Sequence, residues 1–181
     1  MTRTLHEGGA LVDRLVAIED GDTALIRAGF SCLPSGVAAI SAQDEAGEPA
    51  VLVASSFQVG ISLEPPLVLF AVQHTSKSWP KLQKVRRLGV SILAAAHEQA
   101  AWRLASRRPD RFDGVDIVSA PSGATFVRGA SAWMETSIYS EVRAGDHDVV
   151  LLYVHGLATL PETDPLVWHG SGFRMLYRAG R

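Results

Sequence analysis

Two polar loops carry side chains that are well suited to binding a ligand. Ser55-Ser56 follows the apolar run Val51–Val53, and His74–Ser78 follows the apolar run Leu67–Val72. The second loop combines hydroxyls, an imidazole and the Lys77 ammonium, and such groups suit an anion such as a phosphate, because charge-assisted hydrogen bonds are strong. The alternative interpretation is that each loop is an ordinary solvated turn after a core strand.

The stretch around the first loop predicts two buried strands. Leu67–Val72 is apolar without alternation, as in a strand that is covered on both faces. Pro65 and Pro66 exclude a helix before it, because proline fixes φ and lacks an N–H group. We expect the residues from Ser55 to the prolines to form a polar loop. Two buried strands beside such a loop suit the wall of a flat ligand site, although they also fit a plain β core.

A third polar group, Gly145-Asp146-His147, falls between two long strands expected at Trp133–Val142 and Val149–Leu160. Arg143–Asp146 is typical of a hairpin turn. Turn chemistry alone accounts for Asp146, since aspartate favours tight turns. His147, at the start of a strand, can point over a ligand, and histidine titrates near neutral pH.

The remaining sequence predicts many short strands and few helices, which is typical of a small, mainly β barrel. Residues 1–21 are expected to form an N-terminal arm and residues 22–181 a single domain. Helices are expected at Ala10–Ile18, Thr23–Leu33 and His97–Ser106, and a short helix or turn at Trp79–Val85. Further strands are expected at Gly36–Ser41, Val51–Val53, Leu88–Leu93 and Phe173–Tyr177, irregular chain at Val115–Gly129 and a proline-bearing connection at Thr159–Trp168.

The strand Val149–Val154 is apolar on both faces. One face can line a barrel, and the other then needs a cover. A second subunit is the simplest cover, so the sequence predicts a homodimer.

Composition and missing motifs exclude several classes of function. The chain has 181 residues, enough for one domain, and a net charge of −2, which argues against nucleic-acid binding. No apolar run approaches the roughly 18 residues of a membrane-spanning helix, and no signal-peptide core is visible. The single cysteine, Cys32, excludes an internal disulfide and suits the cytoplasm. No GxSxG, GxGxxG, P-loop or HExxH motif occurs, so neither a hydrolase, a Rossmann domain nor a metal site is expected.

Five short pieces occur in a fixed order along the chain, namely Pro34-Ser35-Gly36-Val37, Ser55-Ser56-Phe57, Ser62–Val68, Ser78-Trp79-Pro80 and Gly145-Asp146-His147. Together they resemble the flavin reductase-like family, whose members are FMN-binding split β-barrels with a few short helices. The resemblance extends over about residues 22–180, nearly the whole chain. The segment from Ser56 to Pro65 is one residue longer than the commonest family form, and a bulge at Val59-Gly60 would absorb the difference.

The resemblance implies which residues bind flavin. The family places the loop that matches Ser55–Phe57 against the flavin ring and ribityl chain, and the element that matches Pro34–Gly36 also approaches the flavin. It uses the loop that matches His74–Ser78 for the phosphate. The implied flavin-binding residues are Pro34, Ser35, Gly36, Val53, Ala54, Ser55, Ser56, Phe57, His74, Thr75, Ser76, Lys77, Ser78 and Trp79. Lys84, Arg86 and Arg87 are further cations nearby, and the sequence does not decide which cation reaches the phosphate.

The resemblance also implies an activity, NAD(P)H:flavin oxidoreductase. A hydride would pass from the nicotinamide to FMN or FAD, and the family associates the histidine that matches His147 with the nicotinamide end of NAD(P)H. Such reductases often supply reduced flavin to a partner monooxygenase. The alternative is an FMN-binding protein with little NAD(P)H turnover. The sequence leaves the choice between NADH and NADPH open.

Overall fold

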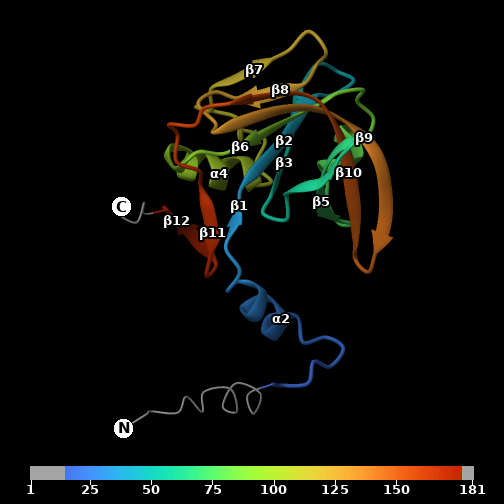
Figure 1. The fold of residues 1–181 in the computed structure, drawn as a ribbon, viewed down its shortest axis with the longest axis vertical. Coiled ribbons are helices and arrows are strands. Elements are labelled where there is room, and N and C mark those ends of the chain that lie inside the picture. Colours follow the sequence, from blue (N-terminus) through green and yellow to red (C-terminus); the bar gives the residue numbers. More distant parts are fainter. Residues whose placement is uncertain (1–14, 177–181) are drawn as a thin grey trace.

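The structure is a computed structural model that describes residues 15–176. Its centre is a seven-stranded antiparallel sheet in the order β3-β2-β6-β9-β10-β5-β4. The sheet curls around its own interior (Figure 1). In chain order its strands are β2 (Ala38–Gln43), β3 (Pro49–Ala54), β4 (Gln58–Leu63), β5 (Pro66–Gln73), β6 (Leu88–Ile92), β9 (Ala132–Ala144) and β10 (His147–Thr159).

Smaller elements flank this sheet. A three-stranded sheet has the order β1-β11-β12, and a separate two-stranded ribbon pairs β7 with β8. The bounds of these strands are β1 (Ser35–Gly36), β7 (Ile117–Ser119), β8 (Thr125–Val127), β11 (Val167–His169) and β12 (Gly172–Arg174). Within residues 15–176 the helices are α2 (Thr23–Phe30), α3 (Trp79–Leu82) and α4 (Glu98–Ala105), and one 3₁₀ turn, η1, spans Ala95–His97.

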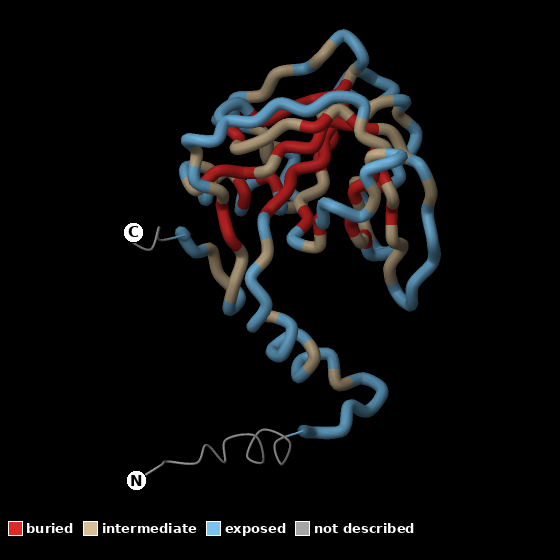
Figure 2. Tube along the Cα trace, viewed as in Figure 1, coloured by how far each residue is buried: buried red, intermediate tan, exposed pale blue. Residues whose placement is uncertain are grey.

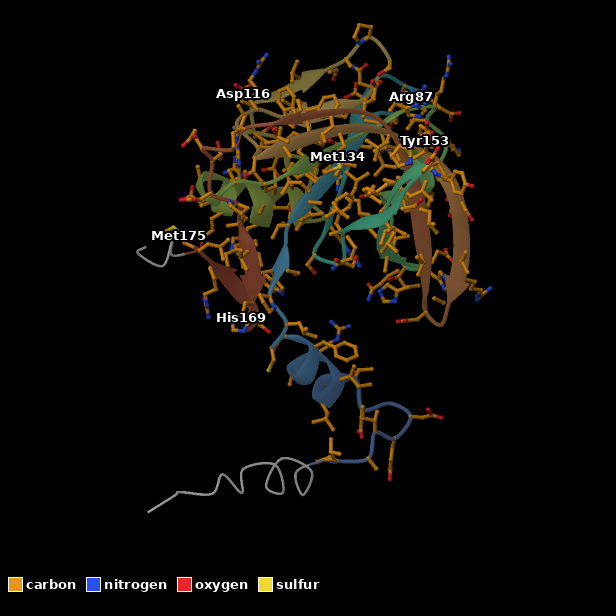
Figure 3. All side chains as sticks on the ribbon, in the orientation of Figure 1. Arg87, Asp116, Met134, Tyr153, His169 and Met175 are labelled. Carbon is orange, nitrogen blue, oxygen red and sulfur yellow. The ribbon has the colours of Figure 1, made fainter. Side chains whose placement is uncertain are left out.

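Two clusters of buried apolar side chains hold these layers together. The first fills the interior of the curved sheet, where Phe70, Ile40 and Leu152 are fully buried and Met134 lies near the middle (Figures 2 and 3). The second cluster joins β2 and β3 to α4 and includes Leu104 and Leu166. Because α4 contributes to this second cluster, its C-terminal end is fixed against β3.

The ribbon β7–β8 is attached to the main sheet by two hydrogen bonds that involve buried serines, one as donor and one as acceptor. Ser41 Oγ donates to the carbonyl of Thr125 over 2.8 Å, and the amide of Val127 donates to Ser91 Oγ over 2.9 Å. Gly89 in β6 lies directly under this contact, where an added Cβ would collide with the backbone of Thr125. The ribbon therefore lies closer to β6 than any side chain at position 89 would permit.

Most of the expected elements are confirmed, and most of the differences are short strands that were not expected. The prediction of a polar loop after Ser55 is wrong where residues Gln58–Leu63 form the strand β4. This strand is exposed and lies at the edge of the sheet beside β5, so it needs no continuous apolar run. Its pairing is irregular between Gln58 and Ser62, and Gly60 has a φ of 74°, which agrees with the predicted bulge.

Other short strands lie in segments that were expected to be irregular. The segment Val115–Gly129 contains β7 and β8, and Thr159–Trp168 runs into β11. The strand expected at Phe173–Tyr177 lies earlier, as β12, and Tyr177 is outside the described residues. Of the helix expected at Ala10–Ile18, residues 15–18 are not helical and the rest lies outside the described residues.

Helix α2 stands away from the barrel (Figure 1), and none of its residues is buried. Leu25, Phe30 and the following Leu33 are exposed apolar side chains in this segment. Between residues 15 and 176, no helix is both long enough and apolar enough to cross a membrane.

Candidate functional site

A cavity of about 940 Å³ opens between the main sheet and the end of α4. One wall comes from β3 and the loop that follows it. A second comes from the end of β5 and the loop at residues 75–78, and a third from residues 104–113 at and after the end of α4. His147, the first residue of β10, completes the lining.

The structure brings nine of the predicted site residues together in this cavity, although they come from three separate segments. They are Val53, Ala54, Ser55, Ser56, Thr75, Ser76, Lys77, Ser78 and His147. The other predicted residues are not among those that line the cavity, and they are Pro34, Ser35, Gly36, Phe57, His74 and Trp79. Their assignment to the flavin site stays a prediction.

The positions of these other residues have a physical reason. Phe57 and Trp79 are core residues, 8% and 5% exposed, and the Trp79 ring packs edge-on against Phe70 at 5.3 Å. Ser35 and Gly36 form β1, which pairs with β11 outside the main sheet.

The two adjacent serines have different environments. Ser56 Oγ accepts a hydrogen bond from the Ala71 amide at 3.0 Å and donates one to the Ala71 carbonyl at 3.1 Å. This pair of bonds fastens the loop to β5. Ser55 is exposed at the cavity wall. Ser56 therefore shapes the wall, and Ser55 offers a hydroxyl to a ligand.

The loop after β5 has a fixed shape. The Ser76 amide donates to the Gln73 carbonyl at 2.9 Å, and Ser76 Oγ accepts from the Trp79 amide at 3.2 Å. These bonds use the Ser76 hydroxyl within the loop. The side chains of Thr75 and Lys77 are exposed and line the cavity.

Arg111 is a cation that the sequence did not single out. Its Nη1 donates to Ser78 Oγ at 3.1 Å, and partial burial lowers the pKa of its guanidinium below the usual range. Among the described residues, no carboxylate lies within ion-pair distance of it. The guanidinium also lies over the Phe112 ring, 5.7 Å from its centroid. A partly desolvated cation that faces a cavity and has only uncharged partners of this kind suits an anionic ligand.

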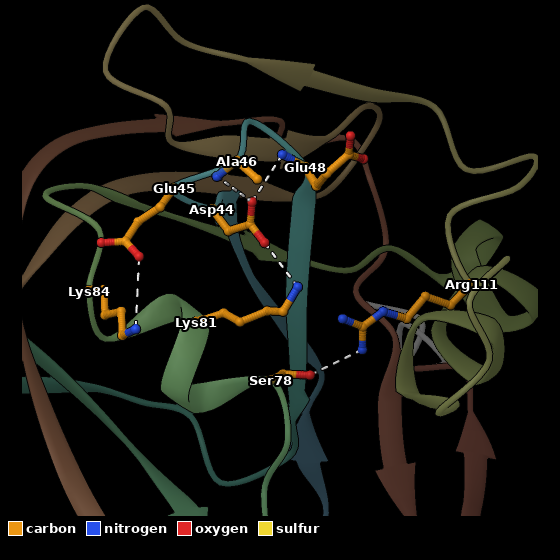
Figure 4. A network of polar contacts seen from close by, with 8 residues as sticks. All are labelled: Asp44, Glu45, Ala46, Glu48, Ser78, Lys81, Lys84 and Arg111. Carbon is orange, nitrogen blue, oxygen red and sulfur yellow. Dashed lines mark hydrogen bonds and ion pairs between the residues drawn. The ribbon is translucent and has the colours of Figure 1, made fainter.

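Other cations near the loop are already paired (Figure 4). Lys81 Nζ lies 2.9 Å from Asp44 Oδ2, and this hydrogen bond holds the pKa of the Asp44 carboxyl below its usual range. Lys84 Nζ lies 3.8 Å from Glu45 Oε2. Arg87 Nη1 lies 2.6 Å from His155 Nε2 and is not part of the cavity lining. Arg107 and Arg108 also line the cavity, and Arg108 is paired with Asp110 at 2.9 Å. Lys77 belongs to the loop itself and Arg111 is bonded to it through Ser78, so these two cations are best placed to meet a phosphate there.

His147 is held by its neighbour in the turn. Its Nδ1 lies 2.7 Å from Asp146 Oδ1, and this contact lowers the pKa of the Asp146 carboxyl. With Nδ1 occupied, Nε2 remains for a ligand. A half-buried imidazole with one nitrogen fixed and the other free is suited to orienting a polar group.

Comparison with known proteins identifies the family of the chain. Residues 30–177 match the model of the family described as flavin reductase like domain. The actinorhodin polyketide dimerase of Streptomyces coelicolor is 34% identical over 87% of this chain and 89% of its own length. The reductase subunit HsaB of a flavin-dependent monooxygenase from Rhodococcus jostii is 34% identical over 87% of this chain and 80% of its own length.

A solved structure shows the same fold. The NADH:FAD oxidoreductase SgcE6 of Streptomyces globisporus, in complex with NAD and FAD fragments, superposes with a TM-score of 0.82 at 31% identity. The match covers 90% of this chain and 98% of that one. The chain therefore belongs to the flavin reductase-like family, and its curved sheet is the split β-barrel of that family.

Proposed function

We propose that this chain is an NAD(P)H-dependent flavin reductase that supplies reduced flavin to a separate monooxygenase. The observation that carries the proposal is the cavity in which Ser55, Lys77, Arg111 and His147 meet, in a chain of this family. The names of two relatives, a monooxygenase reductase subunit and an NADH:FAD oxidoreductase, denote the same kind of activity.

The residues of the cavity fit the separate parts of a flavin nucleotide. Val53 and Ala54 offer a small apolar wall to the ring, and Ser55 adds a hydroxyl at its edge. Lys77 and Arg111 offer two positive charges to the phosphate, which FMN and FAD have in common. A flavin held by these residues would supply the redox chemistry, because flavins can accept a hydride from a nicotinamide.

The contribution of the protein to the reaction is positioning. Hydride transfer between two cofactor rings requires a close, aligned approach of about 3–3.5 Å and no proton transfer in the same step. His147, fixed through Nδ1, would hold the nicotinamide carboxamide through Nε2. No acid–base pair is required among the residues of the cavity.

The proposal extends to the cofactor, the assembly and the compartment. We expect FMN or FAD as the flavin, and a homodimer as the working form. The outward face of β5 and β10 supports the dimer, because Leu69 opposite Leu151 and Ala71 opposite Val149 form a half-exposed apolar surface. A cytoplasmic location follows from the proposed use of NAD(P)H.

The decisive experiment measures oxidation of NADH and of NADPH by the purified protein, with and without added FMN or FAD. Flavin-dependent oxidation at catalytic rates supports the proposal. Tight flavin binding without turnover would instead support an FMN-binding protein, the alternative left open by the sequence. Absence of both turnover and flavin binding would contradict the reductase and the FMN-binding hypotheses alike.

A further inference from the structure

His74 and Asp148 form a contact that the proposed reaction does not use. His74 Nε2 lies 3.0 Å from Asp148 Oδ1, and the two side chains are 32% and 29% exposed. Neither residue is among those that line the cavity. The sequence assigned His74 to the phosphate site, yet its ring is directed at a carboxylate of β10.

The two residues belong to the two halves of the site. His74 begins the loop whose next three residues, Thr75, Ser76 and Lys77, line the cavity. Asp148 directly follows His147 in β10, and His147 is paired with Gln73 in the sheet register. The contact therefore joins the segment proposed for the flavin phosphate to the segment proposed for the nicotinamide.

One further bond joins the same segments, and another joins the start of α3 to β9. The His74 amide donates to the Asp146 carbonyl at 3.1 Å, and Trp79 Nε1 donates to Glu141 Oε2 of β9 at 3.3 Å. Asp146 in turn holds the His147 ring, and its carboxyl pKa is lowered chiefly by His147 and to a smaller extent by His74. The charged neighbour of Asp148 on β9 is Arg143, its partner in the register.

We propose that His74 and Asp148 are positioning residues for the nicotinamide step. Their contact holds the β9–β10 turn against the flavin loop, so that His147 keeps its orientation at the cavity. The inference rests on the proposed function, because it requires His147 to meet the nicotinamide. It gives His74 a role that is distinct from phosphate binding.

The test is a double-mutant cycle between His74→Ala and His147→Ala, with kcat/KM for NAD(P)H and Kd for flavin as separate readouts. We expect His74→Ala to lower kcat/KM by about three- to tenfold and to change flavin Kd by less than about twofold. In the His147→Ala background the same change should have little further effect, because the residue acts through His147. Asp148→Asn should behave like His74→Ala, and His74→Gln, which keeps an N–H donor, should recover part of the loss.

A matched control lies on the same strand. His155 contacts Ser137 at 2.8 Å and Arg87 at 2.6 Å and is not part of the cavity lining. Arg87, which contacts His155, lies on the same side of the barrel as Tyr153 (Figure 3). His155→Ala should leave both readouts unchanged.

Several outcomes would overturn the inference. A full, additive loss in the His147→Ala background would show that His74 acts independently of His147. A parallel fall in flavin affinity would return His74 to the phosphate site, and unchanged kinetics of His74→Ala would remove the role altogether. If His147→Ala itself leaves NAD(P)H kinetics intact, the role proposed for His147 is wrong, and the inference fails with it because it requires His147 to meet the nicotinamide.

Discussion

The guanidinium of Arg111 is half-buried beside Ser78, and burial lowers its pKa. We expect Arg111→Met, which removes the charge and keeps much of the side-chain volume, to weaken FMN binding by tenfold or more. A lost charge-assisted hydrogen bond is worth roughly 1.5–3 kcal/mol. Riboflavin, which lacks the phosphate, should lose much less. Titration of flavin fluorescence with both ligands measures the difference.

Lys84 provides the control for this change, because it pairs with Glu45 and is not part of the cavity lining. Lys84→Met should alter neither affinity. Equal losses of FMN and riboflavin in Arg111→Met would show that Arg111 supports the cavity without touching the phosphate.

His147 is the residue on which the nicotinamide step depends in our proposal. His147→Ala should lower kcat/KM for NAD(P)H by roughly ten- to a hundredfold, at about 1.4 kcal/mol per decade. Its Nδ1 contact is to Asp146 in the turn, so flavin affinity should change little. Steady-state kinetics and flavin titration on the same preparation check both statements. Poor flavin binding with normal nicotinamide kinetics would move His147 to the flavin site or to the fold.

At the residue scale, the sequence predicted types of side chain better than their roles. Ser55 and Ser56 are adjacent residues of the same type, so the sequence cannot tell their roles apart. Only the hydrogen bonds between Ser56 and Ala71 show that the Ser56 hydroxyl shapes the cavity wall. Arg111 could not be chosen from Arg107, Arg108 and Arg111, because the choice depends on which of them the loop brings to Ser78. Such assignments depend on tertiary contacts, which local sequence does not encode.

At the scale of the elements, the close approach of β8 to β6 depends on Gly89. Gly89→Ala would force a methyl group against the Thr125 backbone, which cannot move as a flexible side chain would. Overpacking of this kind costs typically 1–3 kcal/mol, and we expect the free energy of unfolding to fall by about that amount. Thermal or denaturant unfolding of the purified variant measures it.

The matched control is Gly156→Ala in β10, a strand glycine that has no atom within 4 Å of an added Cβ. It should be nearly neutral. A Gly89→Ala variant as stable as the control would mean that β8 can move away from β6 at little cost.

The elements that the sequence missed share a physical cause. The long strands β5, β9 and β10 contain enough apolar residues to be recognised in the sequence, and their predicted bounds differ from the observed ones only by small errors at the ends. The short ribbon β7–β8 is held by Ser91 and Ser41 through the hydrogen bonds that fasten it to the main sheet. Strands of three residues have too little local pattern to be recognised, since β-propensity depends on packing context.

At the scale of the whole molecule, the apolar face of β5 and β10 remains half-exposed in a single chain. Leu151 and Val149 lie opposite Leu69 and Ala71 across the strand pair, and Val142 on β9, opposite Val149, is 53% exposed. A contiguous apolar surface of this kind marks an interaction site. The sequence predicted such a face from the apolar runs Val149–Val154 and Leu67–Val72, because a strand that is apolar on both faces requires a cover on each.

We therefore expect the protein to sediment as a dimer at micromolar concentration and Leu151→Glu to shift it toward monomer while the fold is kept. Obligate dimers commonly bury more than about 2,000 Å² in total, so one charge in the centre of such a face should weaken the association strongly. Ala46→Glu, in the exposed turn between β2 and β3, adds the same charge away from this face and should leave the dimer intact. Circular dichroism separates dissociation from unfolding. A wild-type monomer at these concentrations would contradict the dimer and leave the apolar face of β5 and β10 to a different partner, and a monooxygenase of the kind that our proposal requires would then be the first to test.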